Sequence, residues 1–236
     1  MDGDGIQVIA RAAAVLRALR DAPSGLSLGA LAEATGLPRS TVQRIVAALR
    51  RERLVLATAE GARLGPEVQA LAAAARLDVP GLARPHLLAV ARGTGETVDL
   101  SVLRGGRMVF LDQVPGSHRL RAVSAVGEAF PLATTANGRA VLSLMAPGEA
   151  RRLLEAEGAT DWESLSVRLA DGDGLACDAG EHTPGISALG FAVLAPTGEA
   201  FAVSVPVPTA RWAEAQGAVR AALVAARGAL RADLGA

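Results

Sequence analysis

Residues 38–53 combine side chains that recognise nucleic acid with very little opposing charge. This stretch contains five Arg and one Glu, for a net charge of +4, whereas a merely solvated helix usually mixes both signs. Gln and Arg can make paired hydrogen bonds to adenine and guanine edges, and Ser, Thr and Arg also bind phosphate groups. The expected contacts are Arg39, Ser40, Thr41, Gln43, Arg44 and Arg51. This combination predicts binding to double-stranded DNA.

The residue types used by enzymes and metal sites are scattered. The three His residues are far apart, without a second His or a carboxylate cluster at a metal-ligand spacing. The segment 185–189 lacks the closing Gly of a nucleophile elbow, and Asp171-Gly172-Asp173-Gly174 lacks the spacing of a calcium loop. One cysteine, Cys177, permits neither an internal disulfide nor a cysteine-based metal site. We therefore predict no metal, no cofactor and no enzymatic activity.

A helix-turn-helix is expected to position the basic side chains. Apolar residues keep helical spacing over residues 8–20, which predicts a first helix. Ser27 can cap a short second helix, Gly36 can end it, and a third helix is expected from Pro38 to about Arg53. An apolar stripe that starts at Val42 would bury one face of the third helix and leave the basic face outward. The alternative is an ordinary helical hairpin whose solvated face happens to be basic.

A small β-hairpin is expected directly after the third helix. Short apolar segments flank the turn Ala59-Glu60-Gly61, and Gly65-Pro66 closes the unit. Beside a helix-turn-helix, this hairpin would be a wing whose Arg63 touches the DNA backbone or the minor groove. A single exposed Arg is, however, more often a plain surface residue. The Ala-rich stretch that follows, over 67–76, predicts a linker helix.

From Gly95 onward the pattern changes from helical to strand-like. The expected elements are a helix over 79–92, strands over 97–103, 107–114 and 120–126, a helix over 138–145, strands over 189–194 and 200–205, and a helix over 209–234. Residues 153–174 are polar and mixed and give no assignment. The class is therefore α+β, with a DNA-binding domain over 1–66, a linker helix over 67–78 and a second domain over 79–236.

Composition and charge limit the kinds of partner that the protein is expected to bind. The chain has 236 residues, half of them hydrophobic, which is enough for packed cores and favours two domains. With four Phe, two Trp and no Tyr, it lacks the aromatic surface that single-strand readers use for stacking. Residues 1–76 carry 10 Arg and 7 acidic residues, and residues 77–236 carry 14 Arg and 17 acidic residues. The net charge is therefore +3 for the first segment and −3 for the second. No signal sequence or membrane span is recognised, which predicts a cytoplasmic protein.

The chain resembles the IclR family of bacterial transcriptional regulators from Val8 to the C-terminal helix. In the first half, the resemblance is strongest at Gly25-Leu26-Ser27-Leu28, at residues 32–49 and at Leu64-Gly65-Pro66. In the second half, it lies at Thr94-Gly95-Glu96-Thr97-Val98, at residues 131–140, and at Asp178, Glu181-His182 and Gly185.

The resemblance implies a winged helix-turn-helix joined by a linker helix to a GAF-like effector domain with an antiparallel sheet and flanking helices. It further implies a homodimer or homotetramer on operator DNA, controlled by a small-molecule effector, with repression the more expected outcome. By position, the residues that line the family's effector pocket fall on Ala122, Phe130, Ala136, Asn137, Asp178, Ala188 and Ser204. This lining is less polar than that of family members that bind small acids.

Two of these assignments compete with simpler structural roles. Asp178 lies beside Gly180 and could be a turn residue, and Asn137 could cap a helix or stabilise a turn before Gly138. For the whole protein, the alternative function is a small-molecule sensor, or a GAF-like enzyme, without specific DNA binding.

Overall fold

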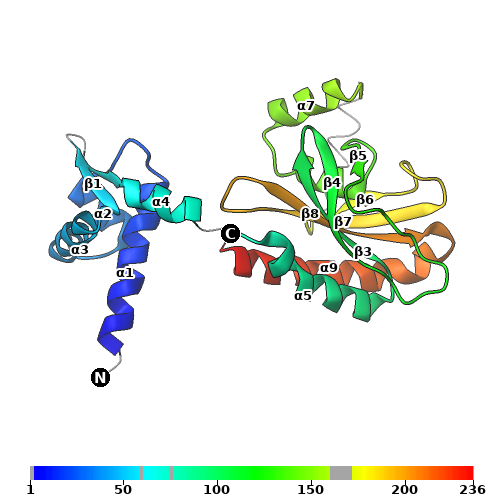
Figure 1. Cartoon of the computed structure of the whole chain (residues 1–236), viewed down its shortest axis with the longest axis horizontal. Coiled ribbons are helices and arrows are strands. Elements are labelled where there is room, and N and C mark those ends of the chain that lie inside the picture. The colour runs from blue at the N-terminus through cyan, green and yellow to red at the C-terminus, as the bar shows by residue number, and fades with distance from the viewer. Residues whose placement is uncertain (1–2, 59–60, 75–76, 160–171, 236) are drawn as a thin grey trace. The chain divides into compact units, whose positions relative to one another are not determined.

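The computed structural model of the chain describes residues 3–58, 61–74, 77–159 and 172–235. The chain divides into two compact units, Met1–Leu77 and Asp78–Ala236, each containing helices and strands (Figure 1). The fold class is α+β, as predicted. Among the helices that these residues form, none is long and apolar enough to cross a membrane.

The first unit is a three-helix core with a β-hairpin. Its elements are α1 (Gly3–Arg20), α2 (Leu28–Thr35), α3 (Arg39–Arg51), β1 (Val55–Thr58), β2 (Gly61–Leu64) and α4 (Pro66–Ala74). The predicted helix-turn-helix is present, because Ser27 Oγ accepts a hydrogen bond from the Ala30 N–H at 3.1 Å and Gly36 ends α2 in the left-handed region with φ 67°. The core brings together Val15 and Leu19 of α1, Leu31 of α2, and the apolar stripe of α3.

The β1–β2 hairpin is held against the segment that precedes α2. Leu26 and Ala62 exchange two backbone hydrogen bonds, at 2.9 and 2.8 Å. Gly61 makes this approach possible, since its φ is 138° and a Cβ there would lie 2.3 Å from the Leu26 carbonyl oxygen. The predicted hairpin is therefore confirmed as a part of the first unit that is fixed beside the helices.

The second unit is an antiparallel sheet between two helical layers. Its elements are α5 (Val79–Thr94), β3 (Val98–Arg104), β4 (Arg107–Val114), β5 (Ala129–Phe130), α6 (Ala136–Leu142), α7 (Pro147–Ala156), β6 (Ala176–Asp178), β7 (Ile186–Leu194), β8 (Ala200–Pro208), a short 3₁₀ turn (Thr209–Arg211) and α9 (Trp212–Leu234). The strand order is β5-β4-β3-β8-β7-β6, with every neighbouring pair antiparallel.

Each face of this sheet has its own core. α5 and α9 pack on one face, where Leu87 and Leu223 meet Phe191 and the Val side chains of β3 and β8. On the opposite face, where Figure 1 shows α7, Leu142 of α6 and Leu154 of α7 belong to one core with Met108. Because side chains alternate along β3, Val98, Leu100 and Val102 face α5 and α9. Asp99 and Ser101 face the α6 side, where Leu103 packs against the second core. That polar row is what builds the site described below.

One expected strand is absent, and three elements, β5, α7 and β6, were not expected. Residues 120–126 do not form a strand, although five of the seven are apolar. Their carbonyl groups accept from side chains instead: Gln113 Nε2 donates to the Ser124 oxygen at 3.0 Å and Arg211 Nη2 donates to the Leu120 oxygen at 2.7 Å. β4 pairs with β5 in place of this segment. Helix α7 and strand β6 arise in or beside the stretch left unassigned, of which residues 160–171 lie outside the described part, as do residues 75 and 76 of the expected linker helix.

Candidate functional site

Helix α3 presents its basic face to solvent. Val42, Ile45, Val46 and Leu49 are buried, which turns the opposite side of the helix outward. Of the predicted DNA contacts, Thr41 is half-buried, and the others on α3 and the hairpin are exposed: Arg39, Ser40, Gln43, Arg44, Arg51 and Arg63. All seven therefore lie where a DNA duplex could reach them without unfolding the first unit.

The start of α3 is open toward a ligand. The first residue of the helix follows Pro38, which has no side-chain hydrogen bond to cap the helix. The first N–H groups of an α-helix have no partner inside it, and they bind phosphate oxygens readily. The Val42 N–H makes the first hydrogen bond of the helix, to the Pro38 oxygen at 3.0 Å. The backbone at Arg39 to Thr41 is thus suited to a DNA phosphate.

A groove between α1 and α3 adds one basic residue that the sequence did not single out. Arg11 of α1 lines this groove with Thr41, Arg44 and Arg51 of α3. In sequence, Arg11 is an isolated charge on a helix with mixed residues, so only the packing of α1 against α3 places it beside the basic face. The groove brings three Arg side chains to one side of the first unit.

The second unit contains a cavity of about 290 Å³ on the α6 side of the sheet. All seven residues predicted to line an effector pocket border it: Ala122, Phe130, Ala136, Asn137, Asp178, Ala188 and Ser204. They come from four strands, from the start of α6 and from the segment 120–126. The structure thus brings together residues that are up to 82 positions apart in the sequence, from Ala122 to Ser204. Whether a ligand touches them remains a prediction.

Nine further residues line the cavity and were not predicted: Asp99, Phe110, Val123, Ser124, Thr135, His182, Thr183, Ile186 and Pro206. The most consequential is Asp99 of β3. Thr97, Asp99 and Ser101 alternate with apolar residues, a pattern normally taken for a solvated strand face. All three are at most 2% exposed. Their polar atoms bond to Gly116, to Ser124 of the segment 120–126 and to Asn137 of α6, respectively. The alternation is visible in the sequence, but the sequence does not show that other segments bury this polar face of the strand.

Asp99 is a buried carboxylate with neutral partners. Gln113 Nε2 donates to Asp99 Oδ1 at 2.7 Å, and Ser124 Oγ donates to Oδ2 at 3.2 Å. Burial raises the pKa of Asp99 to about 6, although these two hydrogen bonds favour the ionised form. The two donors also fix the segment 120–126 over the cavity, because Gln113 reaches both Asp99 and the Ser124 carbonyl oxygen.

Asp178 and Asn137 combine structural roles with positions on the cavity wall. Asp178 Oδ1 accepts the N–H groups of Gly180, Glu181 and His182, at 3.0, 2.7 and 3.4 Å, so it does stabilise a turn. Burial nevertheless raises its pKa, against these hydrogen bonds and the charge of Arg139. Asn137 accepts from the Gly138 N–H at 2.9 Å and donates to Ser101 Oγ at 3.0 Å. The turn role of Asp178 is therefore real, whereas the cap of α6 is Thr135, whose Oγ1 accepts from the Gly138 N–H at 3.2 Å, and Asn137 lies inside the helix. Both Asp178 and Asn137 line the cavity.

An aromatic row forms one wall. Phe110 and Phe130 meet edge to face, with ring centroids 4.9 Å apart, and Phe130 meets the His182 ring in the same way at 4.8 Å. His182 Nδ1 lies 3.3 Å from Thr134 Oγ1, which connects this wall to the segment before α6.

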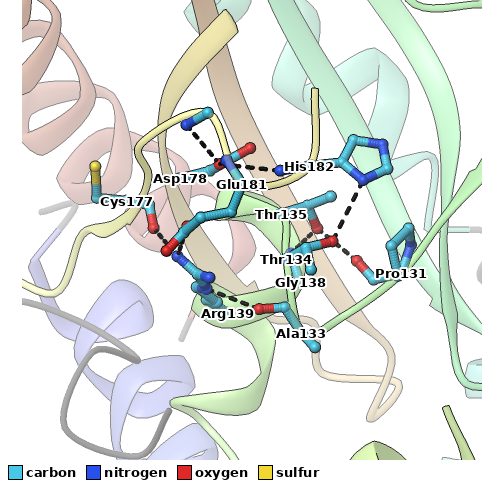
Figure 2. A network of polar contacts seen from close by, with 11 residues as sticks. Pro131, Ala133, Thr134, Thr135, Gly138, Arg139, Cys177, Asp178, Glu181 and His182 are labelled. Atoms are coloured by element: carbon cyan, nitrogen blue, oxygen red, sulfur yellow. Dashed lines mark hydrogen bonds and ion pairs between the residues drawn. The ribbon is translucent and has the colours of Figure 1, made fainter. Parts of the chain in front are cut away.

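A buried Arg fastens the turn that carries Asp178 and His182. Figure 2 shows Arg139 of α6 between Ala133 and the loop of Glu181. Its Nε donates to the Ala133 oxygen at 2.8 Å, and its Nη1 donates to the Cys177 oxygen and to Glu181 Oε2, both at 2.6 Å. The side chain of Arg139 is only 4% exposed. The cavity wall is thus anchored to α6 by one guanidinium group.

Two family models match most of the chain. The IclR helix-turn-helix domain matches residues 8–58, and the C-terminal domain of bacterial transcriptional regulator IclR matches residues 71–230. The chain belongs to the IclR family of bacterial transcriptional regulators. The resemblance stated from the motifs is therefore confirmed, and the protein is a transcriptional regulator with a helix-turn-helix DNA-binding domain.

Individual relatives agree with this assignment. The HTH-type transcriptional regulator Rv1719 of Mycobacterium tuberculosis is 45% identical over 234 residues, covering 94% of this chain and 90% of the relative. The structure of an IclR transcriptional regulator from Silicibacter sp. TM1040 superposes with a TM-score of 0.77 at 25% identity, covering 97% of this chain and 96% of the other. HmgR of Pseudomonas aeruginosa gives a TM-score of 0.66 at 27% identity, with 95% and 96% covered.

Replacing Asp99 by Asn should stabilise the second unit at neutral pH. Because burial raises the pKa of Asp99 to about 6, the ionised form lowers the free energy of unfolding above pH 6, and this cost disappears as the pH falls toward 4. The substitution should raise the free energy of unfolding at pH 7.5 by about 1 to 3 kcal/mol and by about half as much at pH 5. Urea titrations followed by Trp fluorescence report on this unit, since both Trp residues of the chain, Trp162 and Trp212, fall within residues 78–236. A loss of stability at pH 7.5 would show that Gln113 and Ser124 more than offset the burial.

Proposed function

We propose that the protein binds a specific operator through α3 and represses transcription in the cytoplasm, under the control of a small molecule bound in the cavity of the second unit. The observation that best supports this proposal is that one unit contains an exposed, basic helix α3 and the other unit contains a cavity large enough for a small molecule. Repression is the simpler outcome, because a protein bound across a promoter blocks polymerase without a further contact. A sensor or GAF-like enzyme without DNA binding is the alternative.

We further propose that a homodimer, or a dimer of dimers, recognises a near-palindromic operator. One recognition helix reaches only a few base pairs, and two-fold symmetry doubles the sequence that is read. The test is fluorescence anisotropy with the upstream DNA of the protein's own gene and with a random duplex of equal length. A monomer at micromolar concentration that binds both duplexes equally would contradict this proposal and favour the sensor.

Control by the effector requires only a modest coupling between the two sites. A tenfold change in operator affinity corresponds to about 1.4 kcal/mol, supplied by a ligand that prefers one arrangement of the recognition helices. Helix α4 belongs to the proposed route, because Arg53 Nη2 pairs with Glu67 Oε2 at 2.8 Å and so attaches the start of α4 to the end of α3. A ligand that binds the full chain without changing operator affinity would refute this control.

Arg44→Ala should weaken operator binding more than binding to random DNA. Arg44 is exposed on α3 and can hydrogen-bond to a base edge, so its loss should cost about 1 to 3 kcal/mol at the operator. Arg51→Ala should reduce both affinities alike, since it lies further along the helix and is the better candidate for a phosphate contact. Arg92→Ala, which removes an exposed charge from the second unit, is the control. Equal losses for Arg44→Ala on both duplexes would reassign Arg44 to phosphate binding.

A further inference from the structure

The charges around the cavity of the second unit are all of one sign. Asp99 and Asp178 both line it, and none of its described lining residues is Arg; the chain contains no Lys. Arg139 does not line the cavity, and its Nε and Nη1 groups donate to Ala133, Cys177 and Glu181. Among the lining residues that the structure describes, His182 is the one with a basic side chain. A ligand carboxylate placed here would face two carboxylates with little water to screen the repulsion.

The two carboxylates of the wall offer only acceptors when ionised. A carboxylate has about four acceptor positions, and the described hydrogen bonds use one on each oxygen of Asp99. At Asp178, all three backbone donors converge on Oδ1, so Oδ2 lies outside these bonds. A ligand that enters displaces water from these oxygens, and it binds well only if it brings donors of its own.

The remaining wall suits a flat apolar body. The rings of Phe110, Phe130 and His182 form a continuous edge-to-face row, which can accept a further aromatic ring in the same manner. Ile186 and Pro206 add apolar surface. The volume of about 290 Å³ is near the lower end of ordinary ligand pockets, enough for one ring or two fused rings.

We infer that the cavity selects an aromatic compound that carries an amine or hydroxyl donor and discriminates against carboxylates. This ligand class rests on the proposed effector role of the cavity. The neutral alcohol and the cationic amine share the donor that the two Asp residues require, and they differ in whether an ion pair forms.

Four probes of matched shape separate these possibilities: benzylamine, benzyl alcohol, benzoate and toluene, each titrated calorimetrically into the full chain at pH 7.5. The fused-ring set is 2-naphthylmethylamine, 2-naphthalenemethanol, 2-naphthoate and 2-methylnaphthalene. The amine or the alcohol of a set should bind at least about tenfold more tightly than its carboxylate, and more tightly than the hydrocarbon.

Asp99→Asn should lower the affinity for the amine by about fivefold or more, change the affinity for the alcohol little, and raise the affinity for the carboxylate. Glu199→Gln, which removes an exposed carboxylate from the β7–β8 turn outside the cavity, should leave the order unchanged.

The outcomes distinguish this inference from the proposed function. A carboxylate that binds best, or no binding by any of the eight probes at millimolar concentration, overturns the ligand class. If such a carboxylate also alters operator affinity in the anisotropy assay, the proposed function stands with a different ligand. If the amine and alcohol bind in the expected order and operator affinity does not change, the ligand class is supported and the regulatory role of the cavity fails.

Discussion

Arg211→Ala is expected to lower the free energy of unfolding of the second unit by about 3 to 5 kcal/mol, because it leaves a fully buried carboxylate without its main partner. Glu96 is 0% exposed. Arg211 Nε and Nη2 donate to its two oxygens at 2.6 and 2.9 Å, and His118 Nε2 lies 3.6 Å from Oε1. A urea titration followed by Trp fluorescence of the full chain measures the loss.

The same substitution should loosen one side of the cavity. Arg211 Nη2 also donates to the Leu120 oxygen at 2.7 Å, at the beginning of the segment that carries Ala122 and Ser124 over the cavity. Arg211→Lys keeps the charge but not the paired geometry, so it should fall between wild type and Arg211→Ala. Glu96→Gln combined with Arg211→Ala should recover part of the stability, since the buried group is then uncharged. A loss below about 1 kcal/mol for Arg211→Ala would mean that Glu96 behaves like a solvated surface carboxylate.

The first unit was largely predictable because its sequence signals are local. Ser27, Gly36 and the apolar stripe from Val42 act within a few residues of one another, and they fix the second helix, the turn and the outward face of α3. The groove residue Arg11 was missed for the opposite reason. Its position beside Arg44 depends on how α1 packs on α3, which no local pattern encodes.

The residues that line the cavity were predictable only through the family resemblance. The buried charge of Asp99 on the cavity wall was not predicted at all. The seven expected lining residues converge because strands distant in the chain pair side by side, as Asp99 of β3 does with Ser204 of β8. The largely apolar residues 120–126 suggested a strand, yet side-chain donors from Gln113 and Arg211 bind the carbonyl groups of this segment. Asp99 was not predicted to line the cavity, because a polar strand face is ordinarily exposed to solvent. Only the tertiary fold shows that this face is buried.

Arg139→Ala is expected to lower the free energy of unfolding of the second unit by about 3 to 5 kcal/mol as well, because it empties a buried site and leaves two carbonyl oxygens without a donor. The Ala133 and Cys177 carbonyl oxygens would lose their charged donor, and a cavity would open beside α6. Arg139→Met fills most of the volume without a donor, so it should recover only the packing part of the loss. Glu181→Gln should cost less than about 1 kcal/mol, since the Glu181 side chain is 32% exposed.

The functional consequence of Arg139→Met separates positioning from mere stability. Arg139 does not line the cavity, but it holds the turn through which Asp178 and His182 reach the wall (Figure 2). At a temperature where the Arg139→Met variant is fully folded, its affinity for benzylamine or benzyl alcohol should fall by about tenfold, with Glu181→Gln close to wild type. Loss of both bonds to the carbonyl oxygens, rather than of the ion pair, would then account for the displaced turn. If Arg139→Met folds and binds as tightly as wild type, the wall is positioned by packing and by the Asp178 hydrogen bonds alone.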